Sequence, residues 1–60
     1  MERQVSHRVV CPTCGAWAQL RVHYYEDRPP VVVMLSCPNQ TERWHETPTA
    51  AQLVSLIPAP

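Results

Sequence analysis

Polar and apolar side chains alternate along much of the first half of this 60-residue chain, which is typical of β-strands with one buried face. Residues 5–10 alternate loosely and predict a short strand, on which we expect His7 to be exposed. Residues 16–25 alternate more regularly and predict a half-buried strand. On that strand Ala18, Leu20, Val22 and Tyr24 share one face, and Trp17, Gln19, Arg21, His23 and Tyr25 share the other.

A polar break with two prolines, residues 26–30, separates this strand from the next apolar run. Residues 31–35 are mostly β-branched and are apolar on both faces, so we expect them to form the central strand of the sheet. The connection between the two strands is short, which favours an antiparallel hairpin.

The C-terminal segment has the pattern of a short helix. Thr47 resembles an N-cap, Pro48 fits the first helical position and Pro58 is a stop signal, so we expect a helix over about residues 48–57. Two interpretations of its apolar stripe stay open. The stripe either packs back on the hairpin, which we favour, or docks into a groove of a partner protein or of a second copy, with Leu53 and Ile57 as contacts. The stripe comprises Ala50, Leu53, Val54 and Ile57, with Leu56 beside it.

The strongest chemical signal is the segment Cys11-Pro12-Thr13-Cys14-Gly15. Two thiolates separated by two residues can bind one tetrahedral Zn²⁺ if the loop between them turns sharply. Proline and the only glycine of the chain suit that turn. A redox dithiol or a disulfide is the alternative for this pair, but a thioredoxin-like motif needs a βαβ unit that this chain is too short to build. The hairpin would bring Cys37 back beside this loop, and we expect it to be the third ligand and not merely a buried small side chain.

The fourth ligand is less clearly defined by the sequence. Gln40 occupies the position where a second cysteine pair would end, and an amide is a poor zinc ligand. His45, eight positions after Cys37, would complete a Cys₃His site if the loop between them folds back. The predicted ligands are therefore Cys11, Cys14, Cys37 and His45, with Glu42, His23, His7, a water molecule or a residue of another chain as alternatives to His45.

The Cys-Pro-x-Cys-Gly start, the hairpin-sized gap and the Cys-Pro-x-x sequence at residues 37–40 resemble the zinc-ribbon family over roughly residues 9–46. Small phage late-transcription activators have a similar start, a similar gap and an asparagine two residues after the third cysteine. The resemblance implies a structural Zn²⁺, and the narrower likeness implies a role in transcription. This chain differs from those activators at the fourth cysteine and lacks their basic character.

Charge argues against general affinity for nucleic acid. Five arginines are matched by five acidic residues, giving a net charge of zero, and the arginines are scattered along the sequence. Trp17, Arg21 and Tyr25 nevertheless share one predicted strand face. This mixture suits an ordinary solvated face, a protein-interaction surface or a stacking surface for nucleic-acid bases.

We expect no catalysis, because the chain is too small to enclose a deep pocket and shows no nucleophile signature. The only opening for an enzyme is a zinc ion with water at its fourth position, with Glu42 or Glu46 as a base. Three cysteines, no apolar leader and no membrane-length apolar run favour a reducing cytoplasm.

These observations predict one domain, residues 1–60, with a core at about residues 5–46 and a tail helix at about 48–57. The fold class is a small β-rich, metal-stapled domain: a zinc-ribbon-like hairpin or three-stranded antiparallel sheet with a short C-terminal helix. The hydrophobic core of a 60-residue chain contributes little stability, so we expect a bound Zn²⁺ to stabilise the fold by linking its loops. The expected function is that of an accessory protein that binds a larger protein assembly, for which the transcription machinery is one candidate. The alternative is a transcription-associated nucleic-acid binder, and the sequence leaves the oligomeric state open.

Overall fold

A computed structural model describes residues 2–59, which form a three-stranded sheet and one short helix. The strands are β1 (Arg3–Val10), β2 (Trp17–Tyr24) and β3 (Val31–Ser36), and the helix is α1 (Ala50–Ser55). The molecule is elongated, measuring 38 × 18 × 17 Å, because the long hairpin of β1 and β2 sets its length. The predicted fold class, a three-stranded antiparallel sheet with a short C-terminal helix, is confirmed.

The sheet has the order β1-β2-β3, and both neighbouring pairs are antiparallel. Residues 31–35 were expected to form the central strand, and this is wrong, because β2 lies in the middle. An irregularity in the register at Arg21/Val22 makes Val33 an extra residue of β3, and Val33 and Met34 are both about half exposed. A strand whose residues are apolar on both faces can therefore lie at the edge of a sheet and leave one of its faces exposed.

The alternation predicted for β2 is confirmed by burial. Leu20 and Val22 are completely buried, and Ala18 is 5% exposed, because these side chains point toward the face that the helix and the tail cover. Val9 of β1 and two cysteines complete the buried core. Partly buried side chains pack against it, including Tyr24, Val32, Leu35, Leu53, Leu56 and Ile57.

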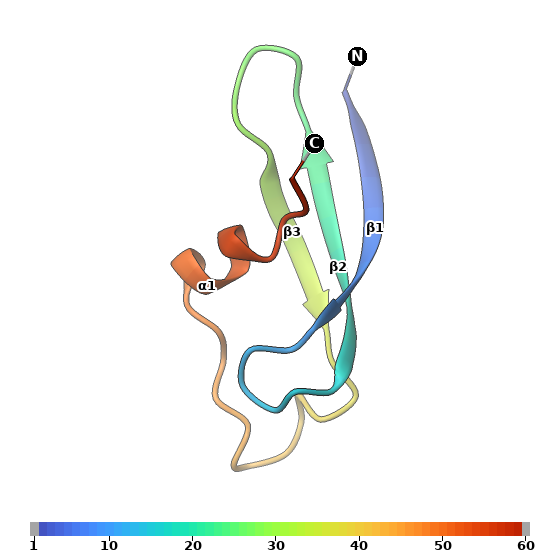
Figure 1. Cartoon of the computed structure of the whole chain (residues 1–60). Helices are drawn as coiled ribbons and strands as arrows, with labels where there is room; N and C mark the ends of the chain where they lie inside the picture. The colour runs from blue at the N-terminus through green and yellow to red at the C-terminus, as the bar shows by residue number, and fades with distance from the viewer. Residues whose placement is uncertain (1, 60) are drawn as a thin grey trace.

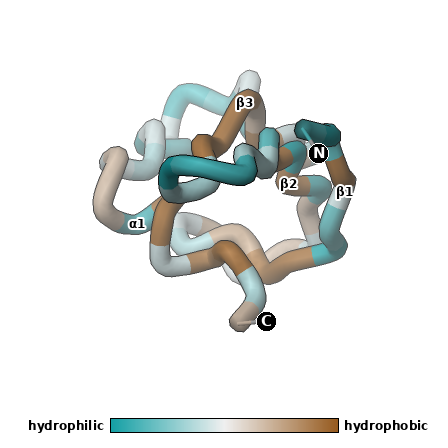
Figure 2. The backbone as a smooth tube through the Cα atoms, turned by 90° about the horizontal axis from the view of Figure 1, so that it is seen from above, coloured by the Kyte–Doolittle hydropathy of each residue, from teal (hydrophilic) through white to brown (hydrophobic). Residues whose placement is uncertain are grey.

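The opposite face of the sheet, which we call the outer face, is not covered by any of the described elements. Its side chains are, by the register of the strands, Gln4, Ser6, Arg8 and Val10 of β1, Trp17, Gln19, Arg21 and His23 of β2, and Val31, Met34 and Ser36 of β3. Helix α1 contacts β3 and lies on the far side of the molecule from β1 (Figures 1 and 2). The sheet therefore has one packed face and one open face.

The C-terminal helix exists but is shorter than expected. It spans six residues, and its N-cap is Thr49, not Thr47. The Thr49 side chain accepts a hydrogen bond from the Gln52 backbone N–H, and the Gln52 side chain accepts one from the Thr49 N–H. This reciprocal capping box is a stronger start signal than a proline alone. No helix in residues 2–59 is long and apolar enough to cross a membrane.

Candidate metal centre

The first two cysteines lie in the tight loop that joins β1 to β2. The Cys11 N–H donates to the Ala16 carbonyl at 2.8 Å, and the Gly15 N–H donates to the Cys11 carbonyl at 2.9 Å. Gly15 has a φ of +75°, a left-handed conformation that other residues rarely adopt. The sequence Cys-Pro-x-Cys-Gly therefore builds the sharp turn that two thiolates at this spacing need.

The other two side chains of the site come from the segment after β3. Cys37 follows the strand directly, and three successive turns carry the chain from there to His45. In these turns the N–H groups of Gln40, Glu42 and His45 donate to the carbonyls of Cys37, Asn39 and Glu42, respectively, at 3.0–3.1 Å. The loop thus folds back toward the first two cysteines, as the sequence required for a Cys₃His site.

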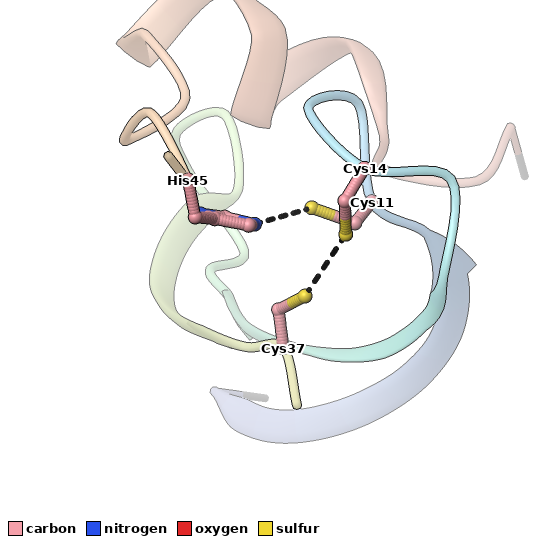
Figure 3. Close-up of side chains that lie close together, drawn as sticks. All are labelled: Cys11, Cys14, Cys37 and His45. Atoms are coloured by element: carbon pink, nitrogen blue, oxygen red, sulfur yellow. Dashed lines mark hydrogen bonds between the residues drawn. The ribbon is translucent and has the colours of Figure 1, made fainter. Parts of the chain in front are cut away.

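The structure brings all four predicted ligands together (Figure 3). One donor atom from each of Cys11, Cys14, Cys37 and His45 lies within 4.8 Å of the other three. The Cys14 and Cys37 sulfurs are 3.4 Å apart, and the Cys11 sulfur is 3.3 Å from the His45 Nε2 atom. Thiolates bound to one tetrahedral Zn²⁺ at about 2.3 Å are themselves about 3.8 Å apart. The size of the cluster and its donor set therefore fit a single tetrahedral metal ion.

The electrostatics of the cluster favour thiolates at two of the three cysteines. Burial by itself raises the pKa of Cys11, but hydrogen bonds from Thr13, His45 and the Cys14 backbone outweigh it and lower the pKa to about 6. A hydrogen bond from the Ala16 backbone and one from Asn39 lower the pKa of Cys14. Burial raises the pKa of Cys37. Because only thiolates bind metal well, Cys11 and Cys14 are prepared for binding and Cys37 must release its proton.

The pKa of the His45 imidazole is also changed by its contact with the cysteines. Its hydrogen bond with Cys11 raises its pKa, because a neighbouring thiolate stabilises the protonated ring. A metal ion needs the neutral imidazole, so it would displace this proton on binding.

Three polar side chains around the ligands were not predicted from the sequence. The Thr13 hydroxyl lies 2.8 Å from His45 Nε2 and 3.2 Å from the Cys11 sulfur. The Asn39 amide donates to the Cys14 sulfur at 3.6 Å. Gln40, expected only to be a poor ligand, accepts a hydrogen bond from the Cys37 N–H at 3.0 Å. Such groups hold ligands in place, and their position within each cysteine loop was the only signal available.

The alternative fourth ligands are not part of this group. His7 bonds to the Tyr24 hydroxyl at 2.7 Å, and His23 lies 3.3 Å from Glu2 at the other end of the sheet. Glu42 is exposed and is absent from the cluster. The expectation that His7 is exposed is wrong, because it is half-buried on the packed face against Tyr24.

The other sequence-predicted contact residues fall into two groups. Trp17 is 59% exposed with the Arg8 guanidinium 5.4 Å from its ring centre, and Arg21 is exposed on the same face. Tyr25, just after β2, is half-buried between the His23 ring, 4.4 Å away, and the Arg28 guanidinium, 4.8 Å away. Trp17 and Arg21 are therefore open to solvent, whereas Tyr25 is partly covered by its two neighbours.

The second group is the apolar stripe of the tail. Leu53 and Ile57 are half-buried and pack against the core, together with Leu56. The favoured interpretation, that the stripe packs back on the hairpin, therefore holds for Leu53, Leu56 and Ile57, whereas Ala50 is exposed. Val54, expected on the same stripe, is 58% exposed.

No known protein family matches the chain in a scan of family models. No curated protein and no solved structure shows significant similarity to it either. The Cys/His cluster and the sheet therefore define the protein as a small β-rich domain with a candidate metal centre.

Proposed function

We propose that this protein is a small accessory protein that binds a larger protein assembly through the outer face of its sheet, while a structural Zn²⁺ holds its fold together. The donor set supports zinc, because three thiolates and one imidazole within 4.8 Å suit a tetrahedral soft-ligand site. Four protein donors also leave no position for a reactive water, which supports a structural and not a catalytic ion. The proposal places the protein in the cytoplasm, where such thiolates stay reduced.

The observation that carries the proposal is the open outer face. Val10, Trp17, Val31 and Met34 are 46–59% exposed on it. A shallow hollow of about 430 Å³ lies beside Trp17 and is lined by Arg8, among other residues. Tryptophan, arginine and methionine are enriched in protein interfaces.

Charge on this face indicates the chemistry of the partner. All five acidic residues lie outside the three strands, whereas Arg8 and Arg21 lie on the outer face; the Glu2 carboxylate lies 3.3 Å from His23 near one end of this face. A partner surface with carboxylates opposite these arginines and apolar groups opposite Trp17 and Met34 would match it. Assemblies of the transcription machinery are one class of partner that the zinc-ribbon resemblance suggests.

Two tryptophans allow a matched experiment. Trp17 and Trp44 are 59% and 60% exposed, but only Trp17 lies on the outer face. We expect Trp17→Ser to abolish copurification of the assembly from the native host and Trp44→Ser to leave it intact, with equal zinc content in both variants. Equal losses, or no loss in either, would contradict the proposal.

Nucleic acid is the second candidate partner, and the separation of charge on the sheet favours it. The three strands contain no carboxylate. Trp17, with an arginine beside it, and Tyr25, near one end of the sheet, could stack on bases, and the arginines could contact phosphates. In that case binding to single-stranded oligonucleotides would weaken steeply with salt and would be lost in Arg21→Ala but not in Arg43→Ala. Salt-insensitive binding to a protein would instead support the first candidate.

A further inference from the structure

Strand β1 is an open edge of the sheet. It is eight residues long, and among the described elements it contacts only β2. The helix lies on the β3 side (Figures 1 and 2). The tail crosses the packed face, where Ile57, Pro58 and Ala59 line a hollow with Arg3 and His7, and neither segment pairs with the β1 edge.

The hydrogen-bonding pattern between β1 and β2 shows which backbone groups of β1 face the open edge. In an antiparallel pair, residues alternate between those that bond the neighbouring strand and those whose N–H and C=O point away from it. The Cys11 N–H bonds to the Ala16 carbonyl, in continuation of the pairing of Val10 with Trp17. Cys11 and every second residue before it therefore bond to β2. The outward residues of β1 are Gln4, Ser6, Arg8 and Val10, which present four N–H and four C=O groups to the free edge.

This edge lacks the devices that usually block strand addition. Proteins protect sheet edges with prolines, bulges, lysines or a covering element. The β3 edge has two prolines before it, an irregular register and α1 beside it. By contrast β1 has no proline and no register shift against β2, and its charges are limited to Arg3 and Arg8.

We propose that β1 pairs with β1 of a second copy in antiparallel fashion, which joins two sheets into one six-stranded sheet. The register centred on His7 places Ser6 opposite Arg8 and Gln4 opposite Val10 of the second copy. This register uses all four outward residues of each strand and sets no arginine against another arginine. It also places Val5 opposite Val9 on the packed face.

Charge and size both favour a second copy as the occupant. The chain has a net charge of zero, so two copies do not repel each other as a whole. Strands of eight, eight and six residues offer a face of roughly 350 Å², and the six strands of two copies offer roughly 700 Å², close to one side of a standard protein interface. Pairing therefore gives the outer face the size that a stable complex requires, although the dimer itself does not depend on any partner.

The test uses the zinc-loaded full chain alone, so it is independent of the proposed partner. Sedimentation should show a concentration-dependent mass of twice 6.9 kDa. Hydrogen exchange should be fast at Ser6 and Arg8 and slow at His7 in dilute protein. At high concentration the exchange of Ser6 and Arg8 should slow at least tenfold.

Three substitutions of Ser6 distinguish association through the β1 edge from association through other surfaces. Ser6→Pro removes an outward N–H but no bond to β2, and we expect it to weaken association at least tenfold, whereas Ser6→Ala should not. Ser6→Arg keeps the backbone but opposes Arg8 of the second copy, and should have the same effect if Ser6→Pro does not fold. A monomer up to about 1 mM, or a dimer in which the Ser6 amide still exchanges fast, would overturn the proposal.

Discussion

The His45 Nε2 atom lies 3.3 Å from the Cys11 sulfur although 34 positions separate the two residues. This contact joins the loop after β1 to the loop after β3. It is also the contact that most directly links the acid–base state of the site to its ability to bind a metal, because each group shifts the pKa of the other.

Removing the metal should unfold the protein. Structural zinc contributes about 10–16 kcal/mol in finger-sized peptides, which exceeds the net stability of most small domains. We expect one zinc ion per chain in native mass spectrometry and loss of the β-sheet circular dichroism signal on chelation. A sheet that survives complete chelation would contradict a structural role for the metal.

His45→Ala should weaken zinc binding by more than about 100-fold, because even side chains behind the ligands change affinity by about 10- to 100-fold. His23→Ala is the matched control, since His23 lies beside Glu2 at the other end of the sheet. Competition with a chromophoric chelator measures both affinities. Equal affinities in the two variants would assign the fourth position to another donor.

The Thr13 hydroxyl lies 3.2 Å from the Cys11 sulfur and can donate to it when the thiolate binds zinc, so Thr13→Val should lower zinc affinity about 10-fold at nearly constant side-chain volume. Thr13→Ser keeps the hydroxyl and should retain the affinity of the original protein. If Thr13→Ser loses as much affinity as Thr13→Val, the methyl group and not the hydrogen bonds supports the site.

Zinc affinity should fall more steeply as the pH falls below about 6, because protons then compete with the metal for Cys11 as well. The pKa of Cys11 is lowered from 9.0 to about 6, so its stabilising contribution is fully present above pH 9.0 and is lost as the pH falls to about 6. His45 has a raised pKa, so its contribution to the metal-free fold is present below pH 6.5 and is lost as the pH rises through the raised value. Acid therefore protonates both Cys11 and His45. Titrations that follow zinc release against pH should show the resulting loss of affinity. A zinc affinity that does not change as the pH falls below about 6 would contradict this prediction.

Gly15→Ala should destabilise the protein by about 1–2 kcal/mol, because Gly15 has a φ of +75°. No atom lies within 4 Å of the position that a Cβ would occupy, so the cost comes from the backbone alone. Gly15→Asn should cost less, since asparagine tolerates this conformation better. Thermal unfolding of the zinc-loaded variants measures both effects, and equal losses would point to a different cause.

Leu53→Asp should destabilise the fold by about 1–3 kcal/mol, because Leu53 packs against the core from the helix. Val54→Asp is its neighbour and control, since Val54 is 58% exposed and should tolerate the change. Chemical denaturation of the two variants tests this difference. An equally stable Leu53→Asp protein would show that the helix does not hold its place on the core.

The sequence by itself determined the features that depend on local pattern. Alternation over residues 16–25 defined β2 and its buried face, because the side chains of a strand point alternately to its two sides. The spacing of Cys11 and Cys14, with Gly15 after them, defined the turn that a metal site needs. The donor types that zinc prefers then predicted Cys37 and His45 as the other two ligands, and the structure brings all four donors together.

Only the tertiary structure decided the features that depend on competition between distant segments. The β-branched run of β3 has the composition of a central strand, yet β2 takes that place because β1 also pairs with it. Helix α1 begins at Ala50, since the Thr49 capping box forms there. Thr13 reaches His45 only because two loops meet at one end of the sheet. Strand order and contacts between loops depend on the summed burial and hydrogen bonding of the whole chain, which no single stretch of sequence contains.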